Sequence, residues 1–172
     1  MLKLNKKAWF GEKPPKNDNS TINLKTLLLL WRSKIIAHFV DGNILKGRTK
    51  DFDPNKEVFH LFPISKSKSP IEVKTSSLKA VFFVKDYKGN RDYKKARSFE
   101  GCPKVTPTQH KIIVHFKDGE TLYGTAHSYS QNRKGFFVYP IDPSDKNKRI
   151  YVVRSAIESV EFSNYKENNK NL

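Results

Sequence analysis

Residues 34–63 read KIIAHFVDGNILKGRTKDFDPNKEVFHLFP, and residues 111–140 read KIIVHFKDGETLYGTAHSYSQNRKGFFVYP. The two stretches align without a gap at an offset of 77, and 12 of the 30 positions are identical. A two-residue insertion then shifts the offset to 79, so that Ile71 aligns with Ile150 and Phe83 aligns with Phe162. Self-similarity at a fixed spacing indicates a structural unit that occurs twice. We call residues 34–93 the first copy and residues 111–163 the second copy.

The pattern within each copy predicts short strands. Apolar and polar residues alternate from residue 35 onward, which is the period of a strand. The Asp-Gly pairs at 41–42 and 118–119 are favoured in tight hairpin turns, because glycine accepts a positive φ. Gly47 and Gly124 interrupt the next strand, where glycine often marks a bulge or bend. Further strands are expected at 58–62, 71–74 and 78–84 and at their equivalents 136–139, 150–153 and 157–162.

Five short, bent strands in each copy favour a mainly β fold of two small five-stranded barrels. Before them, Leu24, Leu27, Leu28 and Trp31 are spaced as one apolar stripe, which predicts a short helix over residues 21–33. Covering a barrel is the favoured role of that helix, and lying on a membrane surface is the alternative. Residues 1–20 are expected to be a disordered basic arm, residues 94–110 a basic linker and residues 164–172 a frayed tail.

Parts of each copy resemble known families. Asp41, Gly42, Gly47, Phe52 and Asp53 are similar to the first motif of the Sm-like fold, and the second copy retains Asp118, Gly119 and Gly124. The Arg-Gly of that family's RNA-contacting motif is missing from both copies, so this resemblance implies a small barrel rather than RNA binding. The strings DGxxLxG at 118–124, GFFxxPxDPxxxNxRIYVV at 135–153 and FFVKDYxGNRDY at 82–93 resemble a bacterial module of unassigned function. That resemblance implies a bacterial, cytoplasmic protein and no particular reaction.

Composition excludes several classes of site. The single cysteine, Cys102, can form no disulfide within the chain and has no cysteine neighbours for a metal cluster. The five histidines show no metal-ligand spacing, and neither a phosphate-binding glycine loop nor a catalytic triad motif occurs. The longest apolar run, Leu27 to Trp31, is too short to cross a bilayer. No cofactor, metal, membrane insertion or enzymatic activity is therefore expected, and the predicted location is the cytoplasm.

A formal charge of +16 favours anionic partners. Residues 1–33 hold seven Lys/Arg against two Asp/Glu, and residues 84–110 hold seven against three, so these segments contribute much of the excess. Basic and aromatic residues alternate near the second of them, an arrangement that could hold phosphates and stack on bases. The candidate nucleic-acid-binding residues are Lys85, Tyr87, Lys88, Arg91, Tyr93, Lys94, Lys95, Arg97, Arg133, Lys134, Arg149 and Tyr151.

These observations predict a non-catalytic binding or adaptor protein that contacts a polyanion such as RNA or DNA. The alternative is a protein–protein interaction or assembly subunit without a nucleic-acid ligand. The two hypotheses differ in their expected response to salt, since only the first relies on neutralising phosphates.

Overall fold

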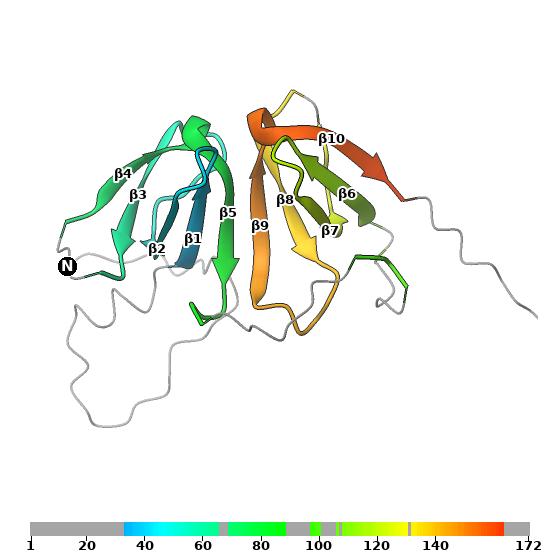
Figure 1. The fold of residues 1–172 in the computed structure, drawn as a ribbon, viewed down its shortest axis with the longest axis horizontal. Helices are drawn as coiled ribbons and strands as arrows, with labels where there is room; N and C mark the ends of the chain where they lie inside the picture. Colours follow the sequence, from blue (N-terminus) through cyan, green and yellow to red (C-terminus); the bar gives the residue numbers. More distant parts are fainter. Residues whose placement is uncertain are drawn as a thin grey trace, which may run out of the picture.

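The structure, a computed structural model, describes residues 33–65, 69–88, 97–100, 106, 108–130 and 132–163. The first copy forms five strands and one 3₁₀ turn: β1 (Ser33–Phe39), β2 (Ile44–Thr49), β3 (Val58–Pro63), β4 (Ile71–Lys74), η1 (Thr75–Ser77) and β5 (Leu78–Val84). The second copy forms the same series: β6 (His110–Phe116), β7 (Thr121–Ala126), β8 (Gly135–Pro140), β9 (Asn147–Val153), η2 (Arg154–Ala156) and β10 (Ile157–Phe162). The prediction of a mainly β fold is confirmed (Figure 1).

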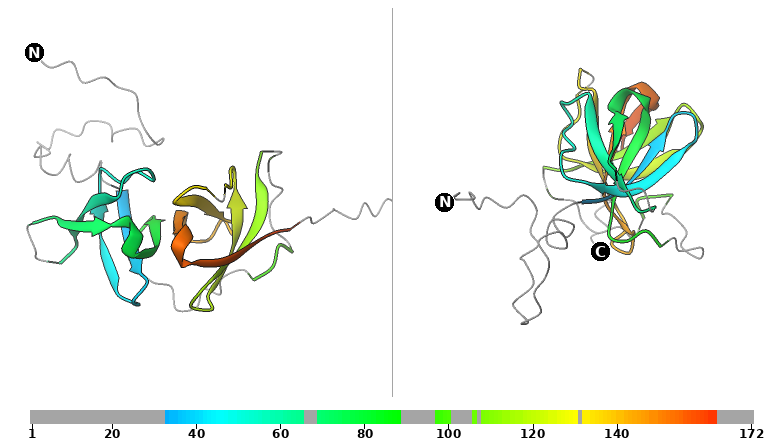
Figure 2. Two further views of the ribbon diagram at one scale, coloured as in Figure 1. Left: turned by 90° about the horizontal axis from the view of Figure 1, so that it is seen from above. Right: turned by 90° about the vertical axis from the view of Figure 1, so that its left-hand side faces the viewer.

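The ten strands form one antiparallel sheet in the order β10-β6-β7-β8-β9-β5-β1-β2-β3-β4. The strand order within the first half, β5-β1-β2-β3-β4, recurs in the second half as β10-β6-β7-β8-β9. Registers correspond as well, because Ile35 pairs with Gly47 and Ile112 pairs with Gly124. The two copies lie side by side and meet where β5 pairs with β9 (Figures 1 and 2). The sheet is therefore continuous across both copies, whereas the sequence predicts two small barrels and leaves open whether they share one sheet.

Strand β5 explains this continuity. All seven of its residues are buried, so both faces of the strand need an apolar neighbour. Ala80, Phe82 and Val84 pack into the core of the second copy. Val81 and Phe83 pack into the core of the first copy. β5 thus belongs to two cores at once.

Strand β9 divides its side chains in the same way. Ile150 and Val152 pack into the second core, while Tyr151 and Val153 enter the first. Tyr151 is 1% exposed, and its phenol lies 3.4 Å from the carbonyl oxygen of Pro54. The two copies therefore complete each other's cores.

The predicted turns are present, but one glycine role differs. Gly42 and Gly119 have φ values of 87° and 84°, as the hairpin prediction requires. At Gly47, by contrast, a Cβ would lie 2.4 Å from the Leu61 side chain and 2.4 Å from the Phe62 carbonyl oxygen. In the same way, a Cβ at Gly124 would lie 2.3 Å from the Val138 side chain. These two glycines allow close approach between neighbouring strands, and the register shifts of the first and second copies fall elsewhere, at residues 38–39 and 157–159.

Some predicted segments fall largely or wholly outside the described residues. The helix expected over residues 21–33 lies outside them except for Ser33, which begins β1. The arm at 1–20 and the tail at 164–172 also lie outside. Within the predicted linker, Phe99 is buried and its ring lies 5.7 Å from that of Tyr123, so this part packs on the second copy. His110, at the end of that range, begins β6.

Candidate anion-binding site

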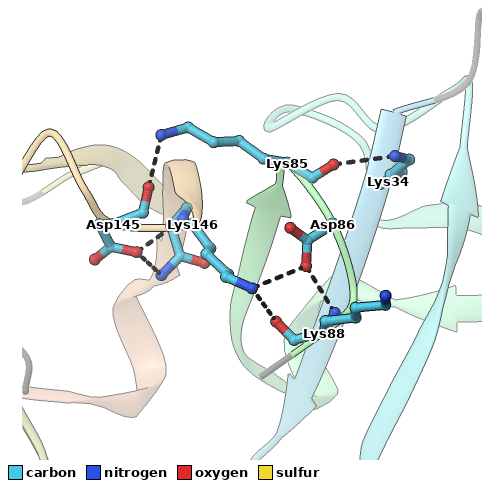
Figure 3. A network of polar contacts seen from close by, with 7 residues as sticks. Lys34, Lys85, Asp86, Lys88, Asp145 and Lys146 are labelled. Carbon is cyan, nitrogen blue, oxygen red and sulfur yellow. Dashed lines mark hydrogen bonds and ion pairs between the residues drawn. The ribbon is translucent and has the colours of Figure 1, made fainter. Parts of the chain in front are cut away.

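The end of β5 lies beside the loop that precedes β9. The two strands run antiparallel with Val84 opposite Asn147, which brings residues 85–88 against residues 142–146. The amide of Lys85 donates to the carbonyl oxygen of Lys146 at 2.8 Å. The start of β1 is also adjacent, because Ile35 pairs with Phe83. Segments of both copies therefore meet at this end of the junction (Figure 3).

Lysine ammonium groups hold these segments together (Figure 3). Lys34 Nζ donates to the carbonyl oxygen of Lys85 at 3.0 Å. Lys85 Nζ donates across the junction to the carbonyl oxygen of Asp145 at 2.7 Å. Lys146 Nζ donates back to the carbonyl oxygen of Lys88 at 2.8 Å and lies 3.3 Å from Asp86 Oδ1. The ion pair with Asp86 balances one of these charges, whereas the hydrogen bonds to carbonyl oxygens bring positive charge together without neutralising it.

Asp86 is the carboxylate at the middle of this group. The backbone amide of Lys88 donates to it at 2.7 Å, and this bond is the largest cause of its lowered pKa. The hydrogen bond from Lys146 and the positive fields of Lys146 and Lys34 lower the pKa of Asp86 further. Asp86 is consequently ionised at neutral pH, yet a single carboxylate balances only one of the surrounding cations.

Arg48 and Tyr87 border the same group. Arg48 stands directly opposite Lys34 in the β1–β2 ladder, and like charges in that position repel. The phenol of Tyr87 donates to the carbonyl oxygen of Gly47 at 2.6 Å. Burial raises the pKa of Tyr87, and the nearby Arg48 partly opposes that change. Tyr87 therefore fastens the segment after β5 to β2 and contributes little ring surface for stacking.

We call Lys34, Arg48, Lys85, Lys88 and Lys146 the junction cluster. Among the described residues of these segments, its five positive charges stand against the three carboxylates of Asp86, Asp142 and Asp145, and Asp145 already accepts hydrogen bonds from Asn147 at 2.8 Å. The described part of the site therefore has a net positive charge of about two, from five cations and three anions. Such a concentration of ammonium and guanidinium groups attracts phosphates and other anions.

Two of the predicted site residues, one half-buried and the other buried, pack where the two copies meet. The Arg149 guanidinium lies 4.5 Å from the ring centre of Phe83 and 4.3 Å from that of Phe137. Burial lowers the pKa of Arg149, and Tyr139 partly offsets this effect. Tyr151 is buried in the first core, so it cannot stack on a base. Their strand is buried on both sides, whereas the sequence interpretation assigns them to an exposed face.

Two other predicted residues lie at the opposite end of the sheet. The Lys134 carbonyl oxygen accepts from the amide of Arg154 in η2, at the far end of β9 from Lys146. Lys134 Nζ lies 3.4 Å from Glu57, which has the equivalent position in the first copy. Arg133 Nη1 donates to Ser128 Oγ at 3.4 Å. Neither residue extends the junction cluster.

The remaining predicted residues follow the cluster in sequence. Arg97 is exposed. Arg91, Tyr93, Lys94 and Lys95 lie outside the described residues. Among the residues that are described, no group of three or more His, Cys, Asp or Glu side chains is arranged to hold a metal ion. The same residues include no helix that is long and apolar enough to span a membrane.

A family model described as a family of unknown function (DUF6982) matches residues 31–163. The chain belongs to this family. No curated protein and no solved structure matches the chain. The region shared with the DUF6982 model includes all ten strands and every member of the junction cluster.

Sequence reasoning about this DUF6982 chain identified Lys85, Tyr87 and Lys88 but missed Lys34, Arg48 and Lys146. Lys34 and Lys146 are separated by 51 and 60 residues from the groups they bond. No local motif connects such distant positions. The only available signal was the alignment of the copies, which predicts corresponding strands but not the pairing of β5 with β9.

Proposed function

We propose that this chain is a non-catalytic binding protein that holds a polyanion, such as RNA or DNA, at the junction cluster. The observation that carries the proposal is the gathering of cationic residues from both copies at one end of the junction. The ammonium groups of Lys34, Lys85 and Lys146 bond the segments that meet there. Exposed Lys88 and the partly buried Arg48 belong to the same segments. Keeping like charges so close has an electrostatic cost, and a bound polyanion would offset it. The cluster would thus gain most from a ligand with several regularly spaced negative charges.

The charge of the chain favours a linear polyanion over a single small anion. Lys88 is followed in sequence by Arg91, Lys94, Lys95 and Arg97, which continue the basic character beyond the cluster. The formal charge of +16 also attracts a polyanion at long range and speeds its association. Because the cluster contains lysine ammonium groups and little exposed aromatic surface, we expect phosphate contacts and little base specificity.

The alternative function is protein–protein interaction, favoured by β4 and β10, which are the two end strands of the sheet among the described residues. Exposed edges are common sites for the addition of a partner strand. That each copy is an Sm-like barrel, that the protein is bacterial and that it acts in the cytoplasm stay predictions.

The proposal can be tested by fluorescence anisotropy with labelled single-stranded RNA, single-stranded DNA and duplex DNA. Lys88→Gln removes an exposed ammonium while leaving intact the Lys88 backbone groups that contact Asp86 and Lys146. Losing one phosphate contact should weaken binding to all three ligands and reduce the salt slope by about 1. Lys117→Gln is the matched control, because Lys117 is exposed beside η2 at the other end of the sheet.

Equal binding by both variants would contradict the proposed site. Absence of binding by the unaltered protein at low salt would contradict the proposed function itself. A decrease confined to Lys88→Gln would support both, and its uniformity across the three ligands would indicate recognition of the phosphate backbone.

A further inference from the structure

Each copy contains the same cluster of three aromatic rings. In the first copy, the ring of Phe52 lies 5.1 Å from that of Phe59 and 5.4 Å from that of Phe83. In the second copy, Tyr129 at the equivalent position lies 5.1 Å from Phe136 and 5.3 Å from Phe162. We call these the first and second aromatic clusters.

Strand β9 covers the first aromatic cluster. The ring of Tyr151 lies 5.2 Å from that of Phe52, edge to face. The Arg149 guanidinium lies 4.5 Å from the ring centre of Phe83. With β9 paired along β5, only 5% of Phe83 remains exposed. An Arg-x-Tyr segment on an added strand is therefore what completes this cluster.

The second aromatic cluster lacks such a cover in the described part of the chain. Strand β10 is at the edge of the sheet and pairs with β6 alone among the described strands. Phe162, the equivalent of Phe83, is 46% exposed. Arg154 approaches the cluster from η2, with its guanidinium 6.0 Å from the ring centre of Tyr129. The His110 ring lies 6.4 Å from that of Phe162, yet almost half of Phe162 stays exposed. An aromatic surface and an unpaired strand edge thus coincide.

A second copy of this chain would fit poorly on that edge. Its available counterpart of β9 is β4, which has Glu72 where β9 has Tyr151 and is preceded by Pro70 where β9 has Arg149. The outward positions of β10 are also polar: Ser159 and Glu161 replace the Ala80 and Phe82 that contact the second core. Another complete five-strand unit would therefore meet a polar surface instead of an apolar one.

A single strand with two different faces suits the edge better. Its inner face would place an aromatic ring on Tyr129 and Phe162, and its outer face would remain in solvent beside Glu158 and Glu161. Glu161 also lies 3.0 Å from His115 Nε2. Both carboxylates favour a basic segment over a nucleic acid, whose phosphates they would repel. Arginine in the inner row would lie over Phe162, as Arg149 lies over Phe83, and gain a cation–π contact.

We propose that the edge of β10 binds an extended, basic segment of a partner protein that contains an Arg-x-Tyr sequence. The segment adds as an antiparallel strand, its tyrosine completing the second aromatic cluster and its arginine covering Phe162. Backbone hydrogen bonds to the edge supply affinity, and the two side chains supply specificity. This site is separate from the junction cluster, so either could exist without the other.

The probe is a labelled peptide with the sequence of residues 146–153, KNKRIYVV, mixed with the full chain. Its control is the same peptide carrying Tyr151→Glu, the residue found at that position in the first copy. We expect saturable binding of the first peptide below about 1 mM, and at least tenfold weaker binding of the control. Chemical-shift changes should map to β10 and Tyr129.

Variants of the chain locate the site. Phe162→Ser should weaken peptide binding at least tenfold, and Glu158→Lys, which preserves the apolar contacts, should weaken it severalfold. Ile71→Ser, a matched substitution on the opposite edge, should change the affinity less than twofold. Absence of peptide binding, or an affinity that neither β10 variant changes, would overturn the proposal. Loss of oligonucleotide binding by Phe162→Ser would also overturn it, because a nucleic acid would then be the occupant.

Discussion

The ring of Tyr151, from the second copy, lies 5.2 Å from the ring of Phe52, in the first, in an edge-to-face arrangement. Such aromatic pairs stabilise a fold beyond the burial of their area. At the equivalent position the first copy has Glu72, which is exposed at the edge of the sheet. The two copies have therefore diverged at this position, where the second copy contacts the first but the first copy faces solvent.

Replacing Tyr151 by alanine should lower the free energy of unfolding by about 3–5 kcal/mol, because a large buried side chain is lost from a packed core. Glu72→Ala, the matched change in the other copy, should alter it by less than about 0.5 kcal/mol. Urea denaturation of both variants measures the difference. Similar stabilities would show that Tyr151 does not complete the first core.

Separating the copies should prevent cooperative folding of the first. A fragment ending at residue 88 would lack Tyr151 and Val153 from its core and would expose Phe82 to water. We expect broad thermal unfolding and weak near-ultraviolet circular dichroism, compared with one sharp transition for the full chain. A sharp transition in the fragment would mean that the copies fold independently.

An ion-pair group across the junction should make stability dependent on pH. Lys79, buried in β5, contacts Asp118 and lies 2.6 Å from Glu120 in the β6–β7 hairpin. Burial alone would lower the pKa of Lys79, but hydrogen bonds to these carboxylates outweigh it and raise the pKa. The pKa of Asp118 is lowered, chiefly by its hydrogen bond with Lys79.

A group with a depressed folded pKa contributes stability above its unfolded pKa of about 4 and loses that contribution as the pH falls through the folded value. For Lys79, the contribution is present below about pH 10 and disappears only at higher pH. Lys79→Met should therefore lower the free energy of unfolding by about 1–2 kcal/mol at pH 7, and by less at pH 3. An equal loss at both values would exclude the carboxylates as the cause, and exposed Lys117→Met provides the control.

Alanine substitutions should distinguish a glycine needed for close approach between strands from one needed for a positive φ. Gly47→Ala places a Cβ against the backbone of β3, so we expect a loss of several kcal/mol or failure to fold. A Cβ at Gly42 would have no neighbouring atom within 4 Å. Gly42→Ala should therefore lower the free energy of unfolding only by the strain of its positive φ, about 1–2 kcal/mol. Thermal denaturation ranks the variants. A larger effect at Gly42 would contradict the role assigned to Gly47.

Much of the local structure is predictable from the sequence. The strands at 71–74, 78–84 and 157–162 match the prediction, because alternation and turn residues act over a few neighbouring positions. The pairing of β5 with β9 is harder to predict from the sequence. The run LKAVFFV is apolar except for Lys79 and indicates burial on both faces, yet it does not specify which strand covers the second face.

The candidate site shows the same division. Lys85 and Lys88 are recognisable within a basic and aromatic stretch, whereas Lys34 and Lys146 join them only because two distant strands pair. Arg149 and Tyr151 look similar to surface residues in the sequence, but the junction of the copies buries Tyr151 and half-buries Arg149. Residues that depend on long-range pairing are thus the ones that local patterns assign wrongly.

The most direct test of the proposed function is the salt dependence of oligonucleotide binding by the full chain. Log affinity for single-stranded RNA should fall linearly with log salt concentration, with a slope of about −0.7 for each phosphate contacted. A variant carrying Lys34→Gln, Lys88→Gln and Lys146→Gln should bind more weakly with a slope about 2 units shallower, and circular dichroism should confirm its fold. An unchanged slope and affinity in a folded triple variant would contradict polyanion binding at the junction cluster.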